Sequence, residues 1–270
     1  MKRLAIIALL LSACLPCRAD EFFAALRATR TRAAATYPQN NPNYSDAYAW
    51  WIFASDADPQ PDVGPLAEMD WYEAAWYGDP AWTNAGGGSI NFDGNDGLYI
   101  ATNNWLSAAT NGTLNAWIYP TANADYQSVF SSSAESRNDR YFIFARYISG
   151  GTPRMLVATR NASSTDWRRT PAGSITDVDT WYMVTLTSNG TAWQIYINGI
   201  IQTLESATGS NNGNWLGDID SRQNISIGFR RQTVDQWQFT GHISDNAIFS
   251  TTFTSNQVYQ LYLDTKDTYE

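Results

Sequence analysis

Residues 181–202 read WYMVTLTSNGTAWQIYINGIIQ, and this stretch decides the fold class. Apolar side chains alternate along two runs, 182–187 and 193–197, with the spacing of strands that bury one face. The Asn-Gly pair at 189–190 predicts a two-residue hairpin turn, because both central positions of such a turn favour positive φ. The Asn-Gly pair at 198–199 repeats that signal. The stretch therefore predicts a three-stranded antiparallel meander.

The same character extends outward over residues 46–270, where short aromatic and β-branched runs are separated by Gly, Asn, Asp and Ser. No helical pattern alternates with these runs, so they favour antiparallel sheets over a parallel sheet. A capping box at 254–257 (TSNQ) predicts a short C-terminal helix. The other candidate strands are 48–54, 89–92, 98–101, 113–119, 127–131, 141–148, 155–159, 225–229 and 242–249.

The composition excludes several classes of protein. The 270 residues include 12 Trp, 15 Tyr and 11 Phe, which can bury enough apolar surface to exclude disorder. His242 is the only histidine, and the two cysteines, Cys14 and Cys17, lie near the N-terminus, which excludes a histidine-based triad and the usual zinc sites. A net charge of −9 disfavours nucleic acid and anionic membranes as partners. Carboxylate chemistry, oxygen-ligated metals and binding alone remain.

The first 19 residues have the pattern of an export signal, a basic head followed by a short apolar stretch. Cleavage after residue 19 would release the protein, whereas LSAC at 11–14 resembles a bacterial lipobox and would leave Cys14 lipidated. Both alternatives predict an extracytoplasmic protein of a bacterium that is secreted, periplasmic or lipid-anchored at the cell surface, with Cys14 as its one membrane attachment. Residues 20–45 predict a short N-terminal helix and a linker before a domain at 46–270.

Six short motifs follow one another along the chain: AWWIF (49–53), GSINFDGND (88–96), LNAWIYP (114–120), the meander (181–199), GHISD (241–245) and FTSNQVYQLY (253–262). In this order they resemble the motifs of laminin-G-like domains in the concanavalin A-like lectin/glucanase superfamily. The resemblance implies an all-β jelly-roll sandwich of two packed antiparallel sheets. It also implies, for most members, binding of glycans or proteins without catalysis.

Three carboxylates in the sequence EMDWYE, Glu68, Asp70 and Glu73, resemble the catalytic strand of laminarinase-type glycoside hydrolases, which share this fold. The resemblance would make one glutamate the nucleophile and the other the general acid, with the aspartate tuning both. In a regular strand, however, Glu73 points away from Glu68, and only a β-bulge would bring the two carboxyls to a face together. The alternative interpretation, which we favour, is a set of solvated acids in a connecting loop.

A structural calcium ion is a second hypothesis. Several jelly-roll binding modules hold one Ca²⁺ between their first and last strands, and carboxylate oxygens are its preferred ligands. Asp56 and Asp58 follow the first candidate strand, and Asp245 lies in the last. The alternative is that Asp56 and Asp58 simply stabilise a turn. A melting temperature that a chelator leaves unchanged would exclude the ion.

Aromatic residues in turn-rich segments are the candidate ligand-binding residues. They have polar neighbours and no core pattern explains them, whereas tryptophans in the candidate strands fit core packing. Flat indoles beside amide and guanidinium donors can stack on sugar rings; the alternative is that they cap the edges of the sandwich. We expect the ligand at edge loops rather than on the outer face of the meander. The candidates are Tyr126, Trp167, Arg168, Trp215, Trp105 and Trp237.

The sequence thus predicts an exported, non-catalytic module that binds carbohydrate or an extracellular protein. Two alternatives stay open: a glycoside hydrolase that uses Glu68, Asp70 and Glu73, and a structural module for cell-surface adhesion. No cofactor is expected apart from the calcium ion.

Overall fold

The computed structural model describes residues 47–51, 75–78, 80–101 and 106–269. All of them belong to one unit of the chain, Asn41–Glu270. The expected signal, the N-terminal helix, the EMDWYE carboxylates, Asp56 with Asp58, and Trp105 lie outside the described residues. Among the described residues, no helix is long and apolar enough to cross a membrane.

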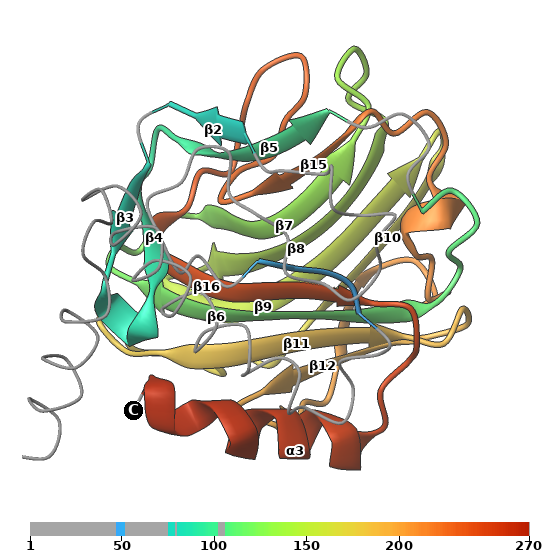
Figure 1. The fold of residues 1–270 in the computed structure, drawn as a ribbon. Helices are drawn as coiled ribbons and strands as arrows, with labels where there is room; N and C mark the ends of the chain where they lie inside the picture. Colours follow the sequence, from blue (N-terminus) through green and yellow to red (C-terminus); the bar gives the residue numbers. More distant parts are fainter. Residues whose placement is uncertain (1–46, 52–74, 79, 102–105, 270) are drawn as a thin grey trace, which may run out of the picture. The chain divides into compact units, whose positions relative to one another are not determined.

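The described strands form two eight-stranded antiparallel sheets, which confirms the predicted β-sandwich (Figure 1). Sheet I runs in the order β13 (Ile200–Ile201), β12 (Trp193–Ile197), β11 (Tyr182–Ser188), β6 (Gly112–Pro120), β16 (Thr240–Phe249), β4 (Ser89–Asp93) and β3 (Ala81–Thr83), with β1 (Ala47–Trp51) also paired to β16. Sheet II runs in the order β14 (Glu205–Thr208), β10 (Ser164–Arg169), β9 (Thr152–Asn161), β8 (Arg140–Ser149), β7 (Tyr126–Ser133), β15 (Asn224–Ile227), β5 (Gly97–Ala101) and β2 (Ala75–Tyr77).

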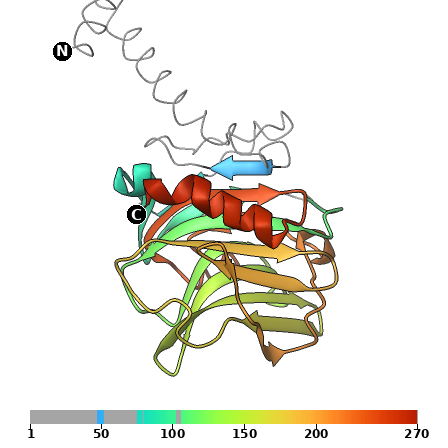
Figure 2. The same cartoon turned by 90° about the horizontal axis from the view of Figure 1, so that it is seen from below.

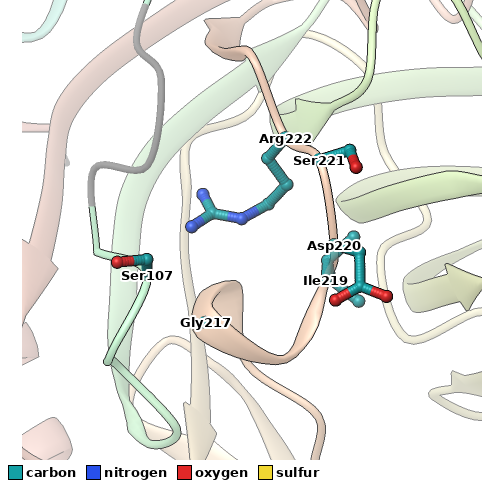
Figure 3. A pocket seen from close by; sticks show the side chains of 6 residues that line it. All are labelled: Ser107, Gly217, Ile219, Asp220, Ser221 and Arg222. Atoms are coloured by element: carbon teal, nitrogen blue, oxygen red, sulfur yellow. The ribbon is translucent and has the colours of Figure 1, made fainter.

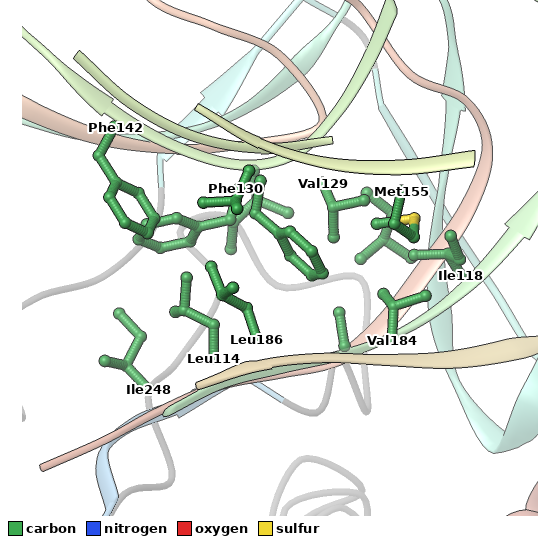
Figure 4. Packing of buried hydrophobic residues seen from close by; sticks show 14 of the residues in the cluster. Leu114, Ile118, Val129, Phe130, Phe142, Met155, Val184, Leu186 and Ile248 are labelled. Carbon is green, nitrogen blue, oxygen red and sulfur yellow. The ribbon is translucent and has the colours of Figure 1, made fainter. Parts of the chain in front are cut away.

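The core lies between the inner faces of the two sheets (Figure 4). Leu114, Val184 and Leu186 of sheet I face Phe130 and Phe142 of sheet II, and each is at most 2% exposed. Alternation along the strands supplies these side chains, since every second residue of a strand points to the same face. Removing one such side chain from water contributes about 1.5–3 kcal/mol.

The predicted meander is β11, β12 and β13, and its two turns differ. Asn198 and Gly199 both have positive φ, 49° and 76°, in the expected two-residue turn. The first turn is instead a four-residue loop, because Ser188 pairs with Trp193. In that loop the Asn189 side chain accepts hydrogen bonds from the backbone nitrogens of residues 191 and 192, at 3.0 and 2.9 Å. These bonds stabilise a wider turn than the Asn-Gly pair alone predicts.

The predicted C-terminal helix is α3 (Ser255–Thr265), and its capping box on Thr254 is present. This helix covers the outer face of sheet I (Figures 1 and 2). The indole of Trp117 donates to Thr265 Oγ1 at 3.0 Å, and the Tyr196 hydroxyl lies 3.2 Å from Ser255 Oγ. The outer face of the meander is therefore packed against the helix. Short 3₁₀ turns at η3 (Ala85–Gly87), η4 (Leu216–Asp218) and η5 (Lys266–Thr268) complete the described helices.

Candidate functional site

The outer face of sheet II carries a second apolar cluster, on the side away from the core. Five residues of β8 and β9 form its floor and are at most 5% exposed; they are Tyr141, Ile143, Ala145, Leu156 and Ala158. Four partly buried aromatic residues cover this floor, and we call them the aromatic face: Tyr126, Tyr147, Trp167 and Trp237. Rings that shield a sheet while remaining partly in solvent can contact a ligand.

Strand register brings the rings of the aromatic face together. Trp167 of β10 pairs with Ala158 of β9, which pairs with Ile143 of β8, so aliphatic side chains lie beside the indole. Tyr126 and Tyr147 are opposite each other on β7 and β8. Trp237 comes from the loop between β15 and β16. Its carbonyl accepts a 2.7 Å hydrogen bond from the Ser128 nitrogen of β7, which fixes this loop across the outer face of the sheet.

Three rings of the aromatic face are stacked, and the fourth, Trp167, is perpendicular to its neighbour. Tyr126 stacks on Trp237 with centroids 4.3 Å apart and on Tyr147 with centroids 4.8 Å apart. Trp167 meets Trp237 edge-on, at 6.4 Å and 90°. Within the described part of the chain no ring stacks on either face of Trp167. Trp167 is therefore the ring of the aromatic face best suited to receive a flat ligand.

Trp237 adopts a backbone conformation that bulky residues avoid. Its φ is +61°, in the left-handed region, which costs a residue with a side chain about 1–2 kcal/mol. The stack on Tyr126, the contact with Arg230 and the carbonyl bond to Ser128 hold it there. Strain of this kind concentrates at binding sites, because the surrounding contacts must fix one geometry.

Arginines flank the aromatic face on two sides. On one side, Arg154 Nη1 lies 2.9 Å and Arg169 Nε 3.4 Å from the carboxylate of Glu205. On the other side, the guanidinium of Arg230 lies over the rings of Tyr141 and Trp237, at 5.1 and 4.7 Å. Guanidinium groups donate in a plane and suit carboxylates and sugar hydroxyls alike.

Two ionisable groups of this surface have displaced pKa values. Burial and a hydrogen bond with Tyr147 raise the pKa of Tyr126 to about 12, so its hydroxyl stays neutral at ordinary pH. Burial lowers the pKa of Arg230, although the neighbouring Tyr141 opposes that shift. The site is thus a neutral aromatic surface bordered by cationic donors.

Three of the six predicted ligand residues, Tyr126, Trp167 and Trp237, meet in the aromatic face. They do not form an edge-loop site, since Tyr126 and Trp167 lie on strands β7 and β10. The polar neighbours of Trp167 indicated a turn-rich segment, whereas Ser164–Arg169 form strand β10. Trp105 lies outside the described residues, so its role stays a prediction.

The other two predicted ligand residues are buried. Trp215 is fully buried and meets Phe142 edge-on at 5.3 Å, so the expectation that no packing explains it is wrong. The reason is the 3₁₀ turn η4, which folds this Asn-rich segment back into the sandwich. Arg168 is 5% exposed and lies 3.6 Å from Asp166; it also donates to the Gly209 carbonyl at 2.7 Å. Both residues support the fold rather than a surface.

Sequence reasoning missed Tyr147 and Arg230. Residues 141–147 alternate between two faces that are both largely apolar, so the pattern did not indicate which face lies outside the sandwich. Arg230 lies in the loop between β15 and β16, which is bonded to β7 through Trp237. Its contacts with Tyr141 and Trp237 depend on this long-range placement, which no local sequence pattern predicts. A signal for Tyr147 was present in its spacing from Tyr141, Ile143 and Ala145.

A polar pocket of about 210 Å³ lies beside η4, away from the aromatic face (Figure 3). Arg222 points toward Ser107 there and donates to Ser132 Oγ at 3.0 Å. Burial lowers the pKa of Arg222 to about 10. The lining has no aromatic ring and suits only a small polar group. Its residues are Ser107, Gly217, Ile219, Asp220, Ser221 and Arg222.

The expected pairing of the first and last strands is present, since Trp51 of β1 pairs with Asn246 of β16. Asp245 is 5% exposed and has a φ of 45°, at the point where the register of β16 shifts. Among the described residues, no three His, Cys, Asp or Glu side chains form a group that could hold a metal. Asp56 and Asp58 lie outside those residues, so the calcium ion stays a prediction.

A sequence model of the concanavalin A-like lectin/glucanases superfamily, Laminin_G_3, matches residues 92–259. No curated protein matches the sequence.

Solved structures are similar in fold at low identity. Domain 4 of AbnA, a GH43 extracellular arabinanase from Geobacillus stearothermophilus solved with arabinotriose, has a TM-score of 0.60 at 13% identity over 80% of this chain and 98% of that one. The CBM40 of a Ruminococcus gnavus sialidase, bound to α2,3 sialyllactose, has a TM-score of 0.50 at 16% identity over 58% and 84%. The binding domain of botulinum neurotoxin serotype D has 0.58 at 14% over 83% and 53%, so this chain spans about half of it.

Proposed function

We propose that this chain, which belongs to the concanavalin A-like lectin/glucanases superfamily, is a non-catalytic binding module whose ligand is a glycan held on the aromatic face. The observation that carries the proposal is Trp167, a partly buried indole on a sheet face with no ring stacked on it and with arginine donors nearby. Sugar rings stack on such indoles, while guanidinium groups bond their hydroxyls.

The choice of ligand rests on the size and chemistry of the face. Four half-buried rings bordered by Arg154, Arg169 and Arg230 offer a few stacking and bonding positions rather than a broad apolar surface. A stable protein partner needs about 800 Å² from each side, with a dry centre. Two of the similar structures were solved with sugars, which supports a glycan. An extracellular protein stays the second candidate, and we propose an extracytoplasmic location for either ligand.

Binding without chemistry fits the environment of Glu205, a carboxylate at the border of the aromatic face. A retaining glycosidase needs two carboxyls about 5–5.5 Å apart, with one of them free to act as nucleophile. Glu205 at the border of the aromatic face is held by two arginines instead. The hydrolase alternative therefore rests on Glu68, Asp70 and Glu73. The alternative of a structural adhesion module would be supported only if the protein bound no ligand.

A polysaccharide pull-down separates these three functions. The purified chain is mixed with insoluble arabinan, cellulose, β-1,3-glucan and chitin, with calcium or with chelator. Retention on one of them is the expected result, release of soluble sugar would indicate the hydrolase, and inertness would indicate the structural module.

Variants of the retained protein then test the position of the ligand. Trp167→Ala should weaken binding ten- to hundred-fold, by analogy with the loss of one aromatic stacking partner on a base, about 1–3 kcal/mol. The control is Tyr259→Ala, which removes a 48% exposed ring from α3 on the opposite sheet and should bind like wild type. Equal loss in both variants would contradict a site on the aromatic face.

A further inference from the structure

We infer that the glycan held by the aromatic face is acidic, and that Arg230 receives its carboxylate or sulfate group. This inference rests on the proposed function and adds to it the class of ligand and the residue that selects it.

The surroundings of Arg230 leave its charge without a carboxylate. The residue is 7% exposed, lies over the rings of Tyr141 and Trp237, and has no acidic side chain of the described residues within ion-pair distance. Its Nη2 donates to the side-chain oxygen of Gln236, and its buried Nε has no acceptor. Nη1 donates to no group of the described residues and is not one of their buried unpartnered atoms, so it is open to solvent beside the rings. A buried guanidinium without a counter-ion is costly, and a ligand anion would offset that cost.

The wider surface is positive although the whole chain has a net charge of −9. The outward positions of β9 and β10 carry Arg154, Arg160 and Arg169, and the only acidic group beside them on β14 is Glu205. Arg160 is exposed, pairs in register with Tyr141, and makes no ion pair with the described residues. Arg230 adds a fourth positive charge. The acidic groups beside these four arginines are Glu205 and Asp125, whose charge acts on Tyr126, so the described part of this face keeps a positive balance and attracts anions.

Stacking and charge recognition are close enough to act on one ligand. Trp167 and Arg230 both contact Trp237, at 6.4 and 4.7 Å. A sugar ring that stacks on Trp167 can therefore direct an exocyclic carboxylate or a sulfate toward Arg230. Arg231 in the same loop is held by Asp235 at 3.0 Å, which leaves Arg230 as the charge available to this group.

The test compares acidic and neutral forms of one polymer by affinity electrophoresis. The pairs are polygalacturonate against its methyl ester, and dextran sulfate against dextran; they distinguish a carboxylate ligand from a sulfate ligand. Wild type should be retarded at least ten-fold more strongly by the acidic member of one pair. Arg230→Gln should reduce that preference to near unity, and Arg160→Gln, at an exposed position of β9, should reduce it several-fold. Lys266→Gln removes the same charge from the opposite sheet and should leave the preference unchanged.

The outcomes separate this inference from the proposed function. Equal retardation by neutral and acidic polymers that still depends on Trp167 overturns the acidic ligand and leaves a glycan-binding module. Retention of the acid preference in Arg230→Gln, whatever Arg160→Gln does, or its equal loss in Lys266→Gln, overturns the role of Arg230. No retardation of wild type by either pair overturns the acidic ligand, and the proposed function fails as well only if the pull-down is negative.

Discussion

Single residues of the aromatic face combine stacking with backbone strain, and Trp237 is the clearest case. Its indole contacts Tyr126, Arg230 and Trp167, so one ring links three parts of sheet II that are distant in sequence. Its left-handed φ of +61° opposes this arrangement. The contacts of the indole therefore hold residue 237 in a backbone conformation that tryptophan by itself disfavours.

Replacing Trp237 by glycine and by alanine separates these two effects. Both variants lose the indole and should lose glycan affinity. Glycine removes the left-handed strain that alanine keeps, so Trp237→Gly should be at least as stable as Trp237→Ala and exceed it by up to about 1 kcal/mol. Urea unfolding of both variants measures the difference. A clearly more stable alanine variant would show that the backbone of residue 237 is not strained.

His242 predicts a stability change near neutral pH. Burial lowers its pKa from 6.5, its Nδ1 has no hydrogen-bond partner, and it lies against the rings of Tyr119 and Trp181. The folded state thus disfavours the imidazolium, and its contribution to stability is present above pH 6.5 and lost as the pH falls through the lowered pKa. The melting temperature of wild type should fall more steeply than that of His242→Asn between pH 7 and 5. Because this is the only histidine, parallel curves would contradict the assignment.

At the scale of elements, the C-terminal segment closes sheet I. Tyr269 follows η5 and stacks on Trp117 with centroids 4.2 Å apart, and its hydroxyl donates to Ser244 Oγ at 2.9 Å. A Cβ at Gly86 would lie 2.5 Å from the Tyr269 ring, so this neighbour must be glycine for the ring to fit. The ring and α3 together bury the outer face of β6 and β11.

Substitutions at Tyr269 test this closure. Tyr269→Phe removes only the hydroxyl bond and should lower the free energy of unfolding by about 1 kcal/mol. Tyr269→Ala also removes the ring and should lower it by about 3–5 kcal/mol. Both values come from urea unfolding. Glycan binding should be unchanged in both variants, and an alanine variant as stable as the phenylalanine variant would show that the ring does not anchor the segment.

The sequence predicted the strands and the helix better than it predicted which of their side chains are buried and which face outward. Alternation predicted the three strands of the meander, although only the second Asn-Gly pair forms the expected two-residue turn. The capping box on Thr254 predicted α3. Trp215 escaped prediction because its polar neighbours describe a loop, while the η4 turn that buries it depends on the Asp218 side chain accepting from the Trp215 nitrogen at 2.7 Å. Strand β8 was predicted, but both of its faces are apolar, and the outer one could be recognised only from the sheet order.

At the scale of the whole molecule, the two outer faces of the sandwich differ. Sheet I is covered by α3 (Figure 2). Sheet II carries half-buried rings and arginines instead. The sheet order and the loop that brings Trp237 onto β7 arise from contacts between distant parts of the chain, so no local pattern contains them. The sequence could therefore supply Tyr126, Trp167 and Trp237 as candidates but not the surface on which they meet.

The central claim is that the ligand lies on the outer face of sheet II. Hydrogen–deuterium exchange tests it most directly, measured with and without the polysaccharide on which the protein is best retained. Bound glycan should slow exchange in β9, in β10 and in the loop at 229–239, and should leave α3 and the pocket beside η4 unchanged. Protection confined to α3, to the loop at 189–192 or to the Arg222 pocket would contradict the account.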